Sequence, residues 1–201
     1  MESNKQLNMD REGRTEFIIH NILIKLNPYA QWKYVLIGLG LCLFINVILF
    51  PWAGNELREV APKAAGPIDL KFSYSQNEVY QMIESYGEKG RDIYIMSTVG
   101  IDLIYPIIYN IVFILILIIL FKKKYPLHGR KHLLAFLPIV VFFADILENT
   151  GILLMLNNYP DRLRNVAFLT SACTSIKWAF VSISLIMIIG LCLIKVRKKD
   201  G

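Results

Sequence analysis

Cysteine is scarce in this sequence, and its arrangement argues against two classes of protein. The three cysteines are Cys42, Cys173 and Cys192, and each falls inside an apolar stretch. No two of them form a C-x-x-C pair, which disfavours a quinone-coupled thiol enzyme. The same spacing implies no disulfide framework.

Histidine is equally scarce, and a metal site has little support. His128 and His132 have a helical i, i+4 spacing, but they lie in a strongly basic loop without a nearby acid, which favours a solvated loop. Carboxylates elsewhere could supply hard oxygen ligands, but no E-x-x-H pair accompanies them. A Gly-rich phosphate loop is missing, and Ser171, Ser175 and Ser182 have no histidine nearby in the sequence. We therefore expect neither a metal nor another cofactor.

Charge is scarce as well, since charged residues make up 19% of the chain against 55% hydrophobic residues. An ordinary soluble domain is not this apolar. Of the 22 Lys and Arg, five lie between Lys122 and Lys131 and four between Lys195 and Lys199. Cytoplasmic loops of membrane proteins concentrate positive charge in this way. The net charge of +6 thus indicates topology, and the lipid bilayer, not a nucleic acid, is the expected partner.

Long apolar runs predict the fold. We expect an all-α, four-helix transmembrane bundle with a short extracytoplasmic amphipathic helix between spans 1 and 2. The predicted spans are residues 34–52, ended by Pro51-Trp52, then 93–121, 133–156 and 166–194. Between them lie an extracytoplasmic loop (53–92), a basic cytoplasmic loop (122–132) and an outer turn (157–165). The N-terminal segment (1–33) and the basic tail (195–201) are expected on the cytoplasmic side of the cell membrane.

Two short helices are predicted outside the spans. Residues 15–26 form a partly amphipathic helix that lies at the cytoplasmic interface or simply extends the first span. Residues 75–86 form a lid helix, which begins at a capping box of Ser75 and Glu78 and stops at Gly87. Its apolar stripe indicates that it lies across the outer mouth of the bundle.

The most costly polar residues occur within the third span. Asp145, Glu148 and Asn149 stand at i, i+3 and i+4, so a helix places them on one face. Charged residues at such a depth in a membrane usually face a protein interior, a cavity or a partner charge.

The other spans carry polar residues at a matching depth. In the second span, Asp102, Tyr105 and Tyr109 share a face, and Pro106 should kink the helix and free a backbone carbonyl beside them. The fourth span carries Lys177, and the first carries Asn46. Counting the helical rise from each inner boundary puts these residues in the outer half of the bilayer.

The charges of this cluster do not balance. Asp102, Asp145 and Glu148 oppose Lys177 alone, a formal surplus of two negative charges unless Arg91 approaches from the outer end. A surplus suits a bound cation or amine, a protonated carboxyl for acid/base chemistry, or a proton pathway. The structural alternative is a polar network that only fixes helix packing.

The leading hypothesis is a membrane protein that binds a lipid-like or small amphiphilic ligand, with acid/base chemistry left open. Candidate catalytic residues are Asp145 or Glu148, which would handle the proton, and Lys177 as counter-ion. The candidate ligand-binding residues are Asp102, Tyr105, Tyr109, Asp145, Glu148, Asn149 and Lys177. Access is expected from the outer leaflet, beneath the lid helix. Two alternatives stay open: a non-enzymatic structural, immunity or accessory protein, and a proton- or cation-coupled transport subunit, which would need an oligomer.

A resemblance covers roughly residues 69–180. Its pattern consists of Tyr74-Ser75, Glu78, Tyr80, Tyr86-Gly87-Glu88, Gly90-Arg91, Tyr94, Asp102, Tyr105-Pro106 and Tyr109, then residues 145–149 and Lys177-Trp178. This string resembles four-span bacterial integral membrane proteins of uncharacterised activity, which implies a shared fold and a shared site. In size and layout the chain is also similar to the sterol-isomerase/sigma-2 type of bundle, which binds amphiphilic amines or sterols at intramembrane acids. That likeness is one of architecture only.

Overall fold

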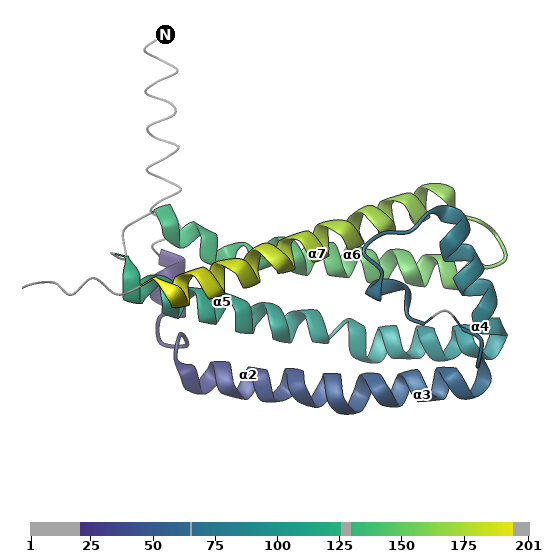
Figure 1. Cartoon of the computed structure of the whole chain (residues 1–201), viewed down its shortest axis with the longest axis horizontal. Helices are drawn as coiled ribbons and strands as arrows, with labels where there is room; N and C mark the ends of the chain where they lie inside the picture. The colour runs from purple at the N-terminus through teal and green to yellow at the C-terminus, as the bar shows by residue number, and fades with distance from the viewer. Residues whose placement is uncertain (1–20, 65, 126–129, 195–201) are drawn as a thin grey trace, which may run out of the picture.

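The computed structural model describes residues 21–64, 66–125 and 130–194, and this part of the chain is helical, without strands. Figure 1 shows its long helices running side by side along one axis. Four stretches are long and apolar enough to cross a membrane: Trp32–Val60, Gln76–Lys124, Lys131–Asn157 and Arg164–Leu193. They suggest a multi-pass membrane protein, and the all-α fold with four long apolar helices is confirmed. The predictions for residues 1–20, for His128 and for the tail 195–201 lie outside the described residues.

The first long helix does not end at Pro51-Trp52, so that prediction is wrong. Helix α2 (Trp32–Phe44) passes through a π-helical turn (Ile45–Leu49) into α3 (Phe50–Val60). Pro51 stands in the first turn of α3, where a missing backbone N–H costs little. The π-helical turn before it absorbs the change in hydrogen-bond register. The connecting loop therefore begins at Ala61, and the first eight residues of the loop predicted over 53–92 are helical.

Helix α4 (Gln76–Ser97) confirms the predicted capping box. The Ser75 amide donates to Glu78 Oε2 at 2.7 Å, and the Glu78 amide donates to Ser75 Oγ at 3.3 Å. Gly87 has φ 65° and ψ −178°, a conformation that glycine alone adopts readily, and it turns the helix sharply. Residues 76–86, called the transverse helix below, cross the end of the bundle, and the rest of α4 runs along it (Figure 1). The second long helix thus resumes directly after Gly87, and the loop predicted over Gly90-Arg91-Asp92 is helical.

The predicted kink at Pro106 is present. A π-helical turn (Thr98–Asp102) ends α4, and α5 (Tyr105–Lys124) starts with Pro106 in its first turn. Since proline has no backbone N–H, the carbonyl of Asp102 loses its helical partner.

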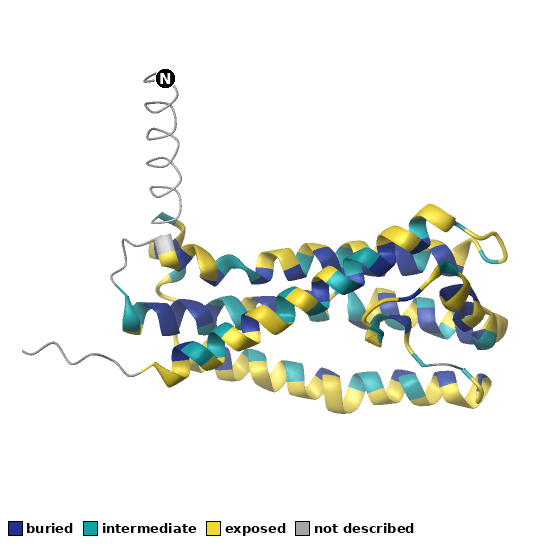
Figure 2. Ribbon diagram, turned by 45° about the horizontal axis from the view of Figure 1, so that its top comes forward, coloured by how far each residue is buried: buried dark blue, intermediate teal, exposed yellow. Residues whose placement is uncertain are grey.

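Helices α6 (Pro138–Asn157) and α7 (Arg164–Leu193) pack tightly against each other. A Cβ placed on Gly151 would collide with the side chain of Thr170, so glycine permits the close approach. The α2–α3 helix is the most exposed of the four. Of its most apolar 18-residue segment, 11% is buried, against 50% for the stretch that contains α6. Figure 2 shows this contrast along the length of the bundle.

The end of the bundle opposite the transverse helix has its own apolar core. Leu23 in the helical residues 21–26 is buried there, in one cluster with Leu117 and Phe121 of α5. A 3-10 helix (Arg130–Phe136) folds back on α5 and buries His132, whose ring centroid lies 5.8 Å from that of Phe121. The solvated-loop prediction is therefore wrong for His132.

Candidate functional site

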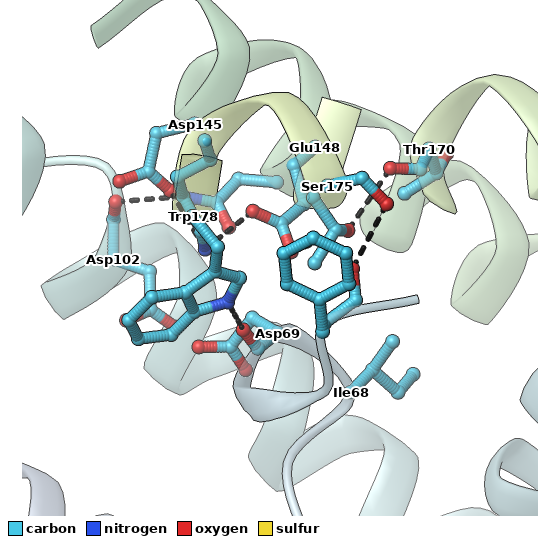
Figure 3. Close-up of polar contacts among 12 residues, drawn as sticks. Ile68, Asp69, Asp102, Asp145, Glu148, Thr170, Ser175 and Trp178 are labelled. Atoms are coloured by element: carbon cyan, nitrogen blue, oxygen red, sulfur yellow. Dashed lines mark hydrogen bonds and ion pairs between the residues drawn. The ribbon is translucent and has the colours of Figure 1, made fainter. Parts of the chain in front are cut away.

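Lys177 lies at the centre of the polar residues. Its Nζ is 2.5 Å from Glu148 Oε2 and 3.5 Å from Asp145 Oδ1. The side chains of Lys177, Asp145 and Glu148 are 9%, 9% and 0% exposed. Because Asp145 and Glu148 are one helical turn apart on α6, both carboxylates reach the same ammonium group on α7 (Figure 3). The face predicted from the i, i+3 spacing is therefore the face that meets the lysine.

Each carboxylate is also held by a hydroxyl group. Tyr109 Oη donates to Asp145 Oδ2 at 2.5 Å, and Thr174 Oγ1 donates to Glu148 Oε1 at 2.8 Å. Removing charges from water is costly unless partners replace the lost hydration. Here two helices, α5 and α7, supply those partners and fix the orientation of both carboxylates of α6.

Asn149 contacts the backbone freed by Pro106. Its Nδ2 donates to the main-chain carbonyl of Asp102 at 2.8 Å. The side-chain carboxylate of Asp102 lines a cavity and has no hydrogen-bond or ion-pair partner within the described residues. Among the three predicted carboxylates, Asp102 is therefore the one whose side chain has no protein partner within the described residues.

Tyr105 belongs to the site but contacts the first helix. Asn46 Nδ2 donates to Tyr105 Oη at 2.7 Å and to the Cys42 carbonyl at 2.8 Å. The ring centroids of Tyr105 and Tyr109 are 5.1 Å apart, so the two rings form one aromatic wall.

A segment that the sequence did not place at the site crosses α7. We call residues 67–74 the strap. Trp178 Nε1 donates to the Asp69 carbonyl at 3.2 Å, and Ser175 Oγ donates to the Phe72 carbonyl at 3.0 Å. The Tyr74 amide donates to Ser171 Oγ at 2.9 Å. These three partners lie at i, i+4 and i+7 on α7, so one helix face anchors the whole strap.

The strap brings a fourth acid, Asp69, to the site (Figure 3). Tyr94 Oη donates to Asp69 Oδ1 at 2.9 Å and accepts the Ile68 amide at 2.9 Å. Burial raises the pKa of the Tyr74 hydroxyl at the far end of the strap. The sequence signal was the alternation of Ile68, Leu70 and Phe72 with polar residues, which is unusual in a loop exposed only to water.

The polar residues line one cavity of about 600 Å³. Its ionisable lining consists of Asp69, Asp102, Asp145 and Lys177, together with tyrosine and cysteine side chains. Much of the remaining wall is apolar and comes from α2–α3, α5 and α7. A cavity of this size, apolar with a few convergent polar groups, has the usual character of a small-molecule site.

Two predicted partners occupy other positions. Glu148 does not line the cavity but lies behind Lys177, where it is fully buried. The Arg91 guanidinium stacks 4.4 Å from the ring centroid of Tyr159 and does not line the cavity. Lys177 is therefore the cation of the cavity lining, and it already contacts two carboxylates.

Ionised, this group of side chains would carry a clear excess of negative charge. Asp69, Asp102, Asp145 and Glu148 against Lys177 give a formal charge of −3. The arrangement can attract a cation, and Asp145, held between Tyr109 and Lys177, can exchange a proton with a molecule in the cavity.

Comparisons with protein-family models, with curated proteins and with solved structures found no match for this chain.

Proposed function

We propose that this chain is a multi-pass membrane protein that binds a lipid-like or small amphiphilic molecule in the cavity beside Lys177. The single observation that carries the proposal is a cavity of about 600 Å³ with acids in its lining and a largely apolar wall. An amphiphile has a polar head group, which the acids can bind, and an apolar tail, which matches the apolar wall. Four helices of sufficient length and apolarity support placement in a membrane.

The proposal places both termini in the cytoplasm and the transverse helix outside the cell. Lys122, Lys123 and Lys124 end α5 at the end of the bundle away from the transverse helix. Positively charged residues next to a span favour the cytoplasmic side. The cavity then lies nearer the outer leaflet, as expected from the depth of the polar residues.

The excess of negative charge favours a ligand with a basic head group. Asp102 has no protein partner within the described residues, and Lys177 is already shared by Asp145 and Glu148. Trp178 and the tyrosines of the lining add aromatic faces, which attract ammonium groups. An amine head at Asp69 and Asp102 would reduce the charge imbalance.

Acid/base chemistry on the bound molecule is an extension of this proposal. Asp145 would be the carboxyl that exchanges a proton with the ligand, because it lines the cavity while Glu148 does not. Lys177 would serve as the counter-ion of both, and Tyr109 would hold Asp145 in place.

A test uses the fluorescence of Trp178, which lines the cavity. Trp32 and Trp52 are exposed and can be replaced by phenylalanine. The probe is a dibrominated stearylamine added to the protein in a bilayer, because bromine quenches tryptophan at short range. If the amine binds in the cavity, the quenching of Trp178 should saturate, and stearylamine without bromine should reverse it.

Two glycines provide a matched pair of variants. Gly54 lines the cavity and Gly40 does not, and a Cβ on either would meet no atom within 4 Å. Gly54→Leu should therefore put an apolar side chain into the cavity and abolish the saturable quenching, whereas Gly40→Leu should retain it. Equal quenching in both variants, or none in the parent protein, would overturn the proposal.

A second candidate function is structural, and one observation favours it. The Lys177–Glu148 pair is deeply buried, and only Lys177 of the two lines the cavity. In a structural or accessory protein the network would lock α6 to α7 and bind nothing. Loss of phenotype in strict proportion to loss of thermal stability, across Glu148→Gln and Lys177→Met, would favour this candidate.

A further inference from the structure

The cavity has exposed lining residues on one side. Leu39 of α2 and Leu70 of the strap are 43% and 65% exposed, although both line the cavity. Asn46 and Pro67 are also exposed and also line it. These four residues, which we call the mouth, lie on the first long helix and on the strap. The opening therefore lies in the side of the bundle.

The end of the bundle is packed instead of open. The cavity has no lining residue from the transverse helix. Val79, Ile83 and Tyr86 of that helix are almost completely buried, in one cluster with Ile152 and Met155 of α6. The access beneath the lid helix that we expected from the sequence is thus replaced by a lateral opening.

The surface beside the mouth is apolar. Leu36, Leu43 and Val47 of the first long helix are 65%, 64% and 57% exposed. Water does not favour a continuous apolar surface, whereas lipid chains match it. The mouth therefore faces the same surroundings as the lipid-facing side of the first long helix.

We propose that the cavity opens sideways into the hydrocarbon interior of the bilayer and takes ligands dissolved there, with the polar head inside and the tail leaving through the mouth. This inference rests on the proposed function and specifies its ligands as long-tailed amphiphiles that reach the site from the bilayer. Because the tail leaves the protein, the site sets no upper limit on tail length.

A series of amines with tails of increasing length tests the inference. Decylamine, stearylamine and behenylamine compete with dibrominated stearylamine for the Trp178 site, with every amount expressed per mole of lipid. An open mouth predicts the same competition constant for all three amines. An enclosed cavity would reject the longest tail, and failure of behenylamine to compete would overturn the inference while the proposed function stood. Failure of all three amines would overturn the proposed function, and the inference with it.

A matched pair on the strap tests the position of the mouth. Leu70 and Phe72 are similarly exposed, at 65% and 62%, but only Leu70 lines the cavity. Leu70→Gln puts a polar group where the tail would pass and should weaken stearylamine binding, whereas Phe72→Gln should leave it unchanged. An equal effect of the two changes would contradict the lateral route.

Discussion

The side-chain amide of Asn149 donates to the main-chain carbonyl of Asp102 at a distance of 2.8 Å. This carbonyl is free because residue 106, four positions later, is a proline. The contact connects α6 to the kink between α4 and α5, at the place where the Asp102 side chain faces the cavity. Asn149 thus supplies the hydrogen bond that the Asp102 carbonyl lacks at the kink. The same kink positions the Asp102 side chain in the candidate site.

The relationship between Asn149 and Pro106 can be tested by a double-mutant cycle. Asn149→Leu should cost roughly 0.6–2 kcal/mol of stability in detergent, the usual range for a polar contact between membrane helices. In a Pro106→Ala background the cost should fall, because residue 106 regains an N–H for the Asp102 carbonyl. Unfolding in a denaturing detergent measures both values, and an equal cost in the two backgrounds would disprove the relationship.

The buried ion pair gives a second prediction. Lys177→Met leaves Glu148 and Asp145 without their cation, and removing one partner of a buried pair typically costs about 3–5 kcal/mol. The double variant Lys177→Met with Glu148→Gln should recover much of that loss, because the fully buried charge is removed as well. Thermal unfolding of the purified variants checks the order. A double variant as unstable as the sum of both single variants would show that the two charges are independent.

The contact between α6 and α7 predicts a steric effect. Gly151→Ala brings a methyl group against Thr170 and should cost about 1–3 kcal/mol, as overpacking usually does. Gly40→Ala is the control, since its Cβ meets no atom within 4 Å. Thr170→Ala should partly rescue Gly151→Ala in the same thermal measurement. Equal melting temperatures for Gly151→Ala and Gly40→Ala would rule out the close approach.

The proposed orientation predicts which end is reached from outside the cell. Glu84 on the transverse helix and Lys123 at the end of α5 are both exposed. In a variant with Cys42, Cys173 and Cys192 replaced by serine, Glu84→Cys should react with a membrane-impermeant maleimide on intact cells. Lys123→Cys should react only after permeabilisation. The reverse pattern would place the transverse helix in the cytoplasm.

The sequence was most informative where a polar residue interrupts an apolar helix. Helical spacing alone put Asp145 and Glu148 on one face, and the high cost of unpaired charge indicated that Lys177 would be their partner. The freed carbonyl near Pro106 followed from the missing N–H of proline. These features depend on local geometry, so an amino-acid sequence is enough to predict them.

Features that depend on the packing of distant segments could not be predicted in this way. Asp69 is in a single 3-10 turn (Ile68–Leu70), and only the contacts of the strap with Ser171, Ser175 and Trp178 bring it to the cavity. The helix that continues past Pro51 depends on a π-helical turn, for which the sequence gives no clear signal. Arg91 looked available to the acids, but its position on Tyr159 follows from the turn at Gly87 and the packing after it.

The central claim is that the acids of the cavity select the head group of a bilayer-borne ligand. The most direct test compares dibrominated stearylamine with dibrominated stearyl alcohol in the Trp178 assay. The parent protein should bind the amine more tightly. Asp69→Asn combined with Asp102→Asn should remove this preference while the alcohol still binds, and Asp161→Asn, an exposed acid outside the cavity lining, should leave it intact. An unchanged preference for the amine after both acids are neutralised would contradict the account.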